Sequence, residues 1–267
     1  MKIHKIYIII LLIINCFFLS CEELILGPQP NFLEDNVFEP GMNVLGILRT
    51  DSIGNISTSF VHVEKNIAAV GDTSENWVIE NVYVRICEIT ETPTTDTVVF
   101  PYQNTDSLFP TKEYRPTYFS AKAGITYRLQ CNHHDFPEIS STTTIPNIPD
   151  IDPASKTIGN DYLSFVILYD STAYFYDVYL KFNNTENTQR LFPEEGENTE
   201  VTFFIQNAEL NHYDIYIYAY DKNLAEYYSS TNVFIKPNTY RPVFSNIDNG
   251  IGCFGSISVF GFTMESN

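Results

Sequence analysis

The sequence is poor in positive charge. It has 15 Lys and Arg residues against 33 Asp and Glu, and its formal net charge is -18. Nucleic acids and anionic lipid headgroups are bound through basic patches. The shortage of basic residues therefore argues against a nucleic-acid partner and against electrostatic attachment to a membrane.

Cysteine is also scarce. Beyond Cys16 and Cys21, the chain contains only Cys87, Cys131 and Cys253, which are too few and too scattered for a disulfide-rich scaffold. We expect buried free thiols, and pairing of Cys87 with Cys131 in an oxidising compartment is the alternative.

Common catalytic motifs are missing. The chain has no H-E-x-x-H, no G-x-S-x-G, no Walker loop and no C-x-x-C pair. We therefore expect no catalytic residues, no cofactor and no enzymatic activity. The densest metal-ligating set is His133, His134 and Asp135, but adjacent strand residues point to opposite faces. These three could share a metal only from a loop, so we expect an exposed turn and no metal site.

The N-terminus has the layout of a secretory signal peptide. Lys2 and Lys5 precede a mostly apolar run over residues 6–19, which is shorter than the roughly twenty residues that a bilayer span needs. Ser20 then directly precedes Cys21, as in the lipobox that bacterial lipoprotein signal peptidase recognises. An uncleaved transmembrane anchor is the alternative.

We expect removal of residues 1–20 and lipidation of Cys21, which becomes the first residue. The removed segment contains two lysines and no acid, so the formal charge changes from -18 to -20. Membrane attachment must then come from acyl chains, each buried methylene contributing about 0.8 kcal/mol. Residues 21–40 are predicted to be a lipidated tether.

Hydrophobic periodicity predicts an all-β fold. Hydrophobic residues make up 44% and aromatic residues 15% of the chain, too much for a disordered protein. Apolar positions recur with period two, as for Val82, Val84 and Ile86, and Gly, Pro, Asn and Asp separate the segments. We expect two β-sandwich-like antiparallel modules. The predicted strands cover residues 44–48, 60–63, 81–89, 126–131, 162–169, 174–182, 201–206, 213–220 and 256–262.

One short helix is predicted near residues 222–230. Asp221 is a good N-cap, and Leu224, Tyr227 and Tyr228 fall at i, i+3 and i+4. We expect this helix to lie across a sheet.

A proline-rich segment marks the predicted domain boundary. Pro146, Pro149 and Pro153 cannot donate to a strand ladder and favour extended chain. The predicted domains are an N-terminal β-sandwich over residues 41–150 and a C-terminal β domain, with the short helix, over residues 151–267.

A stripe of tyrosines is the most unusual feature. Tyr216, Tyr218 and Tyr220 line one face of a predicted strand, and aliphatic residues line the other. An uncovered stripe of this kind is typical of a surface that binds sugars or proteins. The alternative is that the helix after Asp221 covers it.

A turn is predicted at Asp248, Asn249 and Gly250. We expect a positive φ angle at the glycine, and one edge of a calcium site is the alternative interpretation.

Several segments occur in the order in which one protein family has them. They are VLGIL (44–48), ENVYVRICEI (80–89), AKAGITYRLQC (121–131) running into STTTIPNIPDID (141–152), and FSNIDNGIGCFGSISV (244–259). In these segments the chain resembles domain of unknown function 4249, a family of Bacteroidota lipoproteins. The resemblance implies an outer-membrane lipoprotein with a β-sandwich N-terminal half and frequent genomic company with TonB-dependent receptors. It implies no established activity and supplies no catalytic residues.

The same resemblance suggests where the protein is located and how it is modified. In that phylum, acidic residues after the lipidated cysteine act as a surface-export signal, and Glu22 and Glu23 resemble a short version. This implies a lipid-anchored outer-membrane protein at the cell surface, with a periplasm-facing location as the alternative. Three Asp-Ser/Thr-aliphatic triplets resemble the phylum's O-glycosylation sequon, which makes Ser52, Thr97 and Ser107 candidate sites.

Two hypotheses of function follow. The first is a surface-exposed accessory lipoprotein that docks on an outer-membrane β-barrel, such as a TonB-dependent transporter, in cargo capture or complex assembly. The second is a freestanding carbohydrate-binding or adhesin module that uses the tyrosine stripe or the loops near Trp77.

Overall fold

The computed structural model describes most of the chain after residue 40. The described residues are 41–53, 56–65, 78–89, 97–103, 112–116, 118–183, 185–205, 212–230 and 244–265. Cys21, Glu22, Glu23, Trp77 and Ser107 lie outside these residues.

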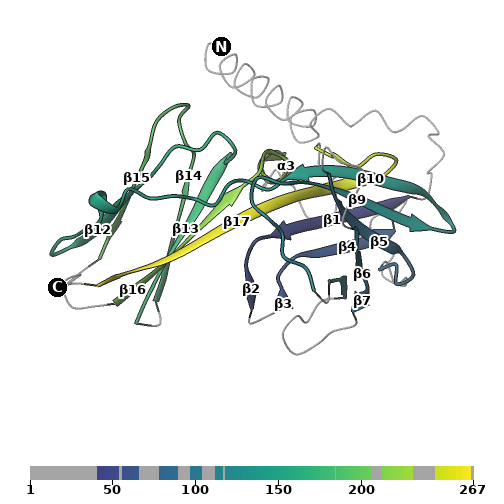
Figure 1. The fold of residues 1–267 in the computed structure, drawn as a ribbon, viewed down its shortest axis with the longest axis horizontal. Helices are drawn as coiled ribbons and strands as arrows, with labels where there is room; N and C mark the ends of the chain where they lie inside the picture. The colour runs from purple at the N-terminus through teal and green to yellow at the C-terminus, as the bar shows by residue number, and fades with distance from the viewer. Residues whose placement is uncertain are drawn as a thin grey trace, which may run out of the picture. The chain divides into compact units, whose positions relative to one another are not determined.

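The described fold is all-β with one short α-helix, which confirms the predicted fold class (Figure 1). The strands are β1 (Met42–Arg49), β2 (Ser52–Ile53), β3 (Ile56–Ser57), β4 (Phe60–Lys65), β5 (Tyr83–Glu88), β6 (Thr97–Phe100), β7 (Tyr102–Gln103), β8 (Glu113–Tyr114), β9 (Thr126–His133), β10 (Phe136–Thr144), β11 (Thr157–Ile158), β12 (Tyr162–Ile167), β13 (Phe175–Phe182), β14 (Thr185–Leu191), β15 (Thr199–Phe204), β16 (His212–Tyr220) and β17 (Ile251–Glu265). The helices are the 3-10 turn η1 (Pro153–Ser155) and α3 (Lys222–Ser230).

Strand pairing builds one large sheet and three smaller ones. The large sheet has eight strands in the order β14-β13-β16-β17-β1-β4-β8-β7. The smaller sheets are β10-β9-β5-β6, β11-β12-β15 and the hairpin β2-β3. The large sheet thus contains strands from both halves of the chain, and β17, yellow in Figure 1, lies between β16 and β1.

Of the strands that were not predicted, the two longest, β10 and β14, lack hydrophobic alternation. In β10, the buried positions include Ser141 and Thr143, whose hydroxyls are hydrogen-bonded inside the fold. In β14, TENTQRL, every side chain is exposed or half-buried, because this strand forms an edge of the large sheet. A polar edge strand is a common protection against edge-to-edge association.

Buried side chains form two main hydrophobic clusters. The first draws on strands of the large sheet, such as β1 and β4, and on β5 and β9 of the four-stranded sheet. The second draws on β13 and β16 of the large sheet and on β12 and β15 of the three-stranded sheet. Each cluster is shared by two sheets, as in a β-sandwich.

The last strand contributes to both clusters. Residues up to Ile145 make the first cluster together with Ile247 and Phe254, whereas the second contains Met264. By its contacts, Pro40–Asn267 is one compact unit. The boundary predicted near residue 150 therefore does not divide the chain into two sets of paired strands, because β17 pairs with β1 on one side of it and with β16 on the other.

The pairing of β17 also differs from the predicted antiparallel arrangement. One edge of the strand pairs in parallel with β1, from Asn43↔Ile251 to Arg49↔Ile257. The other edge pairs antiparallel with β16, up to Tyr220↔Ile257. A parallel pair needs a long connection between its strands, and almost the whole described chain lies between β1 and β17.

The predicted helix is confirmed as α3. Asp221 caps it, because its Oδ1 accepts a hydrogen bond from the Leu224 backbone N–H at 3.0 Å. Leu224 and Ala225 are buried against the large sheet. Across the described residues, none of the helices has the length and apolar character to traverse a membrane.

The turn before β17 has its positive φ angle at another residue than predicted. It occurs at Asn249 (φ 58) and not at Gly250, and a further positive φ angle lies within β17, at Gly252 (φ 121). Asparagine tolerates the left-handed region better than most residues, so it takes this role in the turn. At Gly252 the backbone passes so close to β1 that an added Cβ would lie 1.9 Å from the Val44 carbonyl oxygen.

Candidate functional site

Tyr216, Tyr218 and Tyr220 of β16 point away from the second hydrophobic cluster. Ile215 and Ile217 alternate with them and are fully buried in that cluster. Tyr216 and Tyr218 are half-buried, whereas Tyr220 is only 9% exposed. The three tyrosines predicted as a stripe therefore differ in how far they are accessible.

Helix α3 covers one end of the stripe only. Tyr220 stacks on Phe175 of β13 with ring centroids 4.2 Å apart, and Tyr228 of the helix meets Tyr220 edge-on at 6.2 Å. Leu224 packs in the same cluster. Tyr220 is therefore part of the interior beneath the helix, and Tyr216 and Tyr218 remain as candidates for contact with a partner.

A third tyrosine joins them from the neighbouring strand. Tyr179 of β13 pairs with Tyr216 across the ladder, and its ring meets that of Tyr218 edge-on at 5.0 Å. We call Tyr179, Tyr216 and Tyr218 the outer tyrosine face. Sequence analysis did not identify Tyr179, because only the register between β13 and β16 places it beside the stripe.

Two cations lie over rings of the outer tyrosine face. The Arg49 guanidinium carbon is 5.3 Å from the centre of the Tyr218 ring, and Lys181 Nζ is 5.5 Å from that of Tyr216. Both distances fit cation–π contacts. Arg49 is held in place by Asp51, to which it donates two hydrogen bonds of 2.8 and 2.7 Å.

An ion pair and an aromatic contact extend the same face. Arg190 of β14 donates hydrogen bonds of 2.8 and 2.7 Å to Asp177, whose side chain is buried. The Arg190 guanidinium also lies 4.4 Å from the centre of the Phe175 ring. Beside that ring, Phe192 is 64% exposed at a centroid distance of 5.8 Å. Aromatic rings and arginines that are ion-paired with aspartates thus occur together on this side of the large sheet.

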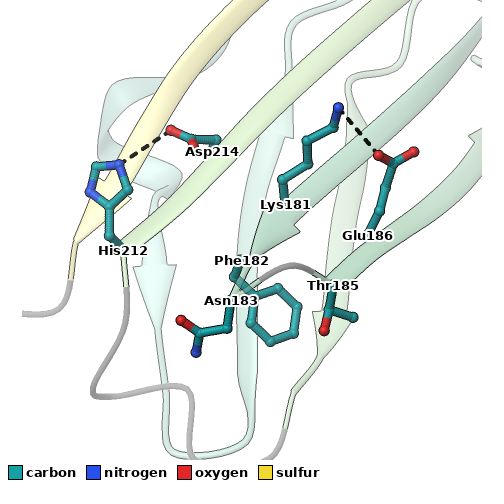
Figure 2. Close-up of a pocket in the computed structure, with 7 residues that line it drawn as sticks. All are labelled: Lys181, Phe182, Asn183, Thr185, Glu186, His212 and Asp214. Atoms are coloured by element: carbon teal, nitrogen blue, oxygen red, sulfur yellow. Dashed lines mark hydrogen bonds and ion pairs between the residues drawn. The ribbon is translucent and has the colours of Figure 1, made fainter.

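A polar depression of about 530 Å³ continues the face toward the ends of the strands. Figure 2 shows Lys181 paired with Glu186 and His212 paired with Asp214 at this end, with N–O distances of 3.2 Å in both pairs. His212 Nδ1 also lies 2.9 Å from Glu265. Hydrogen bonds to Glu265 and Asp214 raise the pKa of His212. The depression therefore offers both positively and negatively charged hydrogen-bonding groups.

The other predicted residues lie apart from this face. His134 and Asp135 occupy the exposed turn between β9 and β10, as the sequence indicates. Ser52 and Thr97 are exposed at the first positions of β2 and β6.

Cys87 and Cys131 are free thiols in the structure. They lie on the paired strands β5 and β9, where Val84 and not Cys87 stands opposite Cys131. Burial raises the pKa of the Cys131 thiol, which makes it unreactive.

Comparisons with known proteins place the chain in a family. Residues 51–261 match the family described as domain of unknown function (DUF4249), and the chain belongs to that family. The description assigns no activity to it. Comparison with curated proteins finds no match.

Fibronectin type III structures are among the solved structures that resemble the chain. A two-domain segment of chicken tenascin has 10% identity and a TM-score of 0.27, with 85% of this chain and 98% of that one covered. Chicken CNTN1 FN1-FN3 domains have 8% identity and a TM-score of 0.28, with 66% and 57% covered.

Proposed function

We propose that this DUF4249 protein is a lipid-anchored accessory protein of the outer membrane that docks on an outer-membrane β-barrel. A TonB-dependent transporter is the proposed class of partner, and the proposed role is cargo capture or complex assembly. The lipobox-like Ser20-Cys21 supports the anchor, and Glu22 and Glu23 support exposure at the cell surface. The outer tyrosine face supports docking.

The observation that carries the docking proposal is the pairing of tyrosines with cations. Tyrosine and arginine are enriched among the residues that dominate protein–protein binding energy. In the outer tyrosine face, Arg49 and Lys181 lie over Tyr218 and Tyr216. A sugar ring stacks on an open aromatic face, and here one face of each of these two rings is occupied. The arrangement therefore favours a protein partner over a stacked sugar.

The strand framework suits a docking surface. β13, β16 and β17 are adjacent in the large sheet and are fixed by continuous ladders. Their inner faces belong to the second hydrophobic cluster. Side chains on such a sheet are held in position before a partner arrives, which lowers the entropy lost on binding.

The predicted tether fits this role by length. Residues 22–40 comprise 19 residues, and a chain of that length spans at most about 65 Å. A partner in the same membrane is therefore within reach of the folded part.

The alternative function is a freestanding carbohydrate-binding or adhesin module. The polar depression at the strand ends favours it, because about 530 Å³ is within the size range of ligand pockets. Lys181, Glu186 and His212 would then serve as hydrogen-bonding groups.

A pull-down of the tagged, lipidated full-length protein from detergent-solubilised outer membranes tests the docking proposal. We expect one β-barrel protein in near-stoichiometric amount, identified by mass spectrometry. A Tyr216→Ala/Tyr218→Ala variant should lose at least about 90% of it, as expected for central interface residues. Cys21→Ala should also reduce recovery, because the unlipidated protein is not held at the membrane.

A matched control keeps the result specific. Tyr118 and Phe204 are 84% and 83% exposed and do not belong to the outer tyrosine face, so the Tyr118→Ala/Phe204→Ala variant should recover the barrel fully. Equal recovery with both double variants would show that the face is not the interface. If no variant and no wild-type sample recovers a barrel, the proposal is wrong, and a glycan screen tests the alternative.

A further inference from the structure

The turn between β9 and β10 brings three metal-ligating side chains together. β9 ends at His133 and β10 begins at Phe136, which is its partner across the ladder, so His134 and Asp135 form the two-residue turn. One ligand atom of each of His133, His134 and Asp135 lies within 4.8 Å of the other two. Along an extended strand these neighbours would point to opposite faces. They meet because the chain reverses direction here.

The separations are close to those around a bound metal ion. His134 Nε2 lies 3.1 Å from Asp135 Oδ2, and the two imidazole rings have centroids 4.3 Å apart. Ligands bound to zinc at about 2.0–2.1 Å are about 3.4 Å apart in a tetrahedral site. The pair His134 and Asp135 already has nearly this spacing. The third ligand atom, at most 4.8 Å away, needs to move by about 1.5 Å or less to reach the tetrahedral spacing.

We infer that His133, His134 and Asp135 form a surface site for a divalent first-row transition metal ion such as Zn²⁺. Imidazole nitrogen suits zinc, copper and nickel, whereas calcium and magnesium prefer sets of oxygen ligands. Three protein ligands leave positions that water fills, as in open zinc sites.

A hydrogen bond engages one ring nitrogen of His133 and has to open for a metal ion to bind there. The Asp135 backbone N–H donates to His133 Nδ1 at 3.1 Å, so Nδ1 carries a lone pair in this geometry and Nε2 carries the proton of the neutral ring. The metal ion takes this lone pair in place of the amide hydrogen. His134 and Asp135 are 72% and 65% exposed, so water can bond to the released amide.

The surroundings leave the site open. A depression of about 770 Å³ adjoins the turn and is lined also by Lys65, Glu80 and Phe136. The carboxylate of Glu80 is 3.7 Å from Lys112 and accepts a hydrogen bond from the Tyr102 hydroxyl, so it is engaged elsewhere. Lys65 adds a positive charge, which opposes the metal ion. We therefore expect reversible binding.

Isothermal titration of the full-length lipidated protein in detergent micelles with zinc chloride tests the inference. The protein carries an affinity tag without histidine. We expect one equivalent of zinc per chain and a loss of affinity of about tenfold or more in His133→Gln/His134→Gln, as both imidazole ligands are removed. Copper(II) electron paramagnetic resonance should show nitrogen hyperfine coupling that the double variant loses.

Two controls separate this site from other binding groups. His212→Gln removes a histidine that lies beside two carboxylates, and Cys87→Ser removes the most accessible of the described thiols. Both variants should bind zinc as the wild type does. Zinc binding that is unchanged in His133→Gln/His134→Gln, or absent from the wild type at millimolar zinc, would overturn the inference. The substituted turn is exposed, so thermal melting should confirm that the variants fold, and Asp135→Asn serves as a second variant.

Discussion

Replacing Asp221 with asparagine should change how the stability of the fold depends on pH. The Asp221 side chain joins three elements and is only 5% exposed. It caps α3 through Leu224 N–H and accepts a hydrogen bond of 2.5 Å from the Thr143 hydroxyl of β10. Burial raises the pKa of Asp221 to about 6, although the hydrogen bonds from Thr143 and Leu224 oppose the rise.

The magnitude follows from the difference between the folded and unfolded pKa values. An unfolded aspartate has a pKa of 3.8 and the folded one about 6. One pKa unit corresponds to about 1.4 kcal/mol, so the ionised carboxylate costs the folded state about 3 kcal/mol at neutral pH. The folded state binds this proton more tightly than the unfolded chain does. The contribution of Asp221 to stability therefore increases as the pH falls from 7 through 6, and it levels off below the unfolded pKa of 3.8.

Asparagine is a suitable replacement because the surrounding hydroxyls can reverse their hydrogen bonds. The introduced side-chain amide would donate to Thr143 Oγ, whose proton can turn toward Ser256 Oγ at 3.0 Å. Ser256 already donates to the Thr144 carbonyl oxygen at 3.0 Å. The oxygen of the amide keeps the helix cap, since asparagine is among the best N-cap residues.

Urea unfolding of the wild type and Asp221→Asn at several pH values measures the effect. The difference in unfolding free energy between the two proteins should change by about 2.5 kcal/mol between about pH 7.5 and 4, with the variant relatively more stable at the higher pH. Titrations common to both proteins cancel in this difference. A difference that stays constant over this range would refute the reasoning, because a constant offset reports only how well the amide fits.

Two further predictions concern stability. Gly252→Ala should lower the free energy of unfolding by about 3 kcal/mol or more, because a Cβ at φ 121 would collide with β1. Gly196→Ala, at φ 79 with no atom within 4 Å of the added Cβ, should cost only about 1 kcal/mol. Thermal melts compare the two variants, and equal losses of stability would contradict the collision. Tyr114→Phe should lower the free energy of unfolding, measured in urea, by about 2 kcal/mol or more, because the buried hydroxyl donates to the Ile79 carbonyl and accepts from the Val82 N–H. A decrease below about 0.5 kcal/mol would show that these two backbone groups find other hydrogen-bond partners.

Local patterns predicted the elements that have a strong local signal. Strand β9 has alternating buried residues, and its segment was predicted from period two. The helix α3 was predicted from the cap at Asp221 and the spacing of Leu224. Strands β10 and β14 lacked that signal, since buried hydroxyls replace apolar residues in one and both faces of the other are polar.

The candidate binding face was predicted in part. The sequence placed Tyr216 and Tyr218 on one face of a strand, but it also grouped them with Tyr220, which the structure places beneath α3. Tyr179 and Arg49 come from distant parts of the chain and reach the tyrosines through the ladders of β13 and β17.

The sequence by itself determined the all-β class, the short helix near residues 222–230, the family, and the expectation of a lipid anchor at Cys21. These depend on short segments, whose side-chain period and residue types are independent of the rest of the chain. Only the tertiary structure decided that β17 pairs with both β1 and β16, that Arg49 lies over Tyr218, and that His133, His134 and Asp135 converge. Each of these depends on which strands pair, in which register they pair, and where the chain reverses direction. A slip of one residue in the register of a strand would turn all of its side chains to the other face of the sheet.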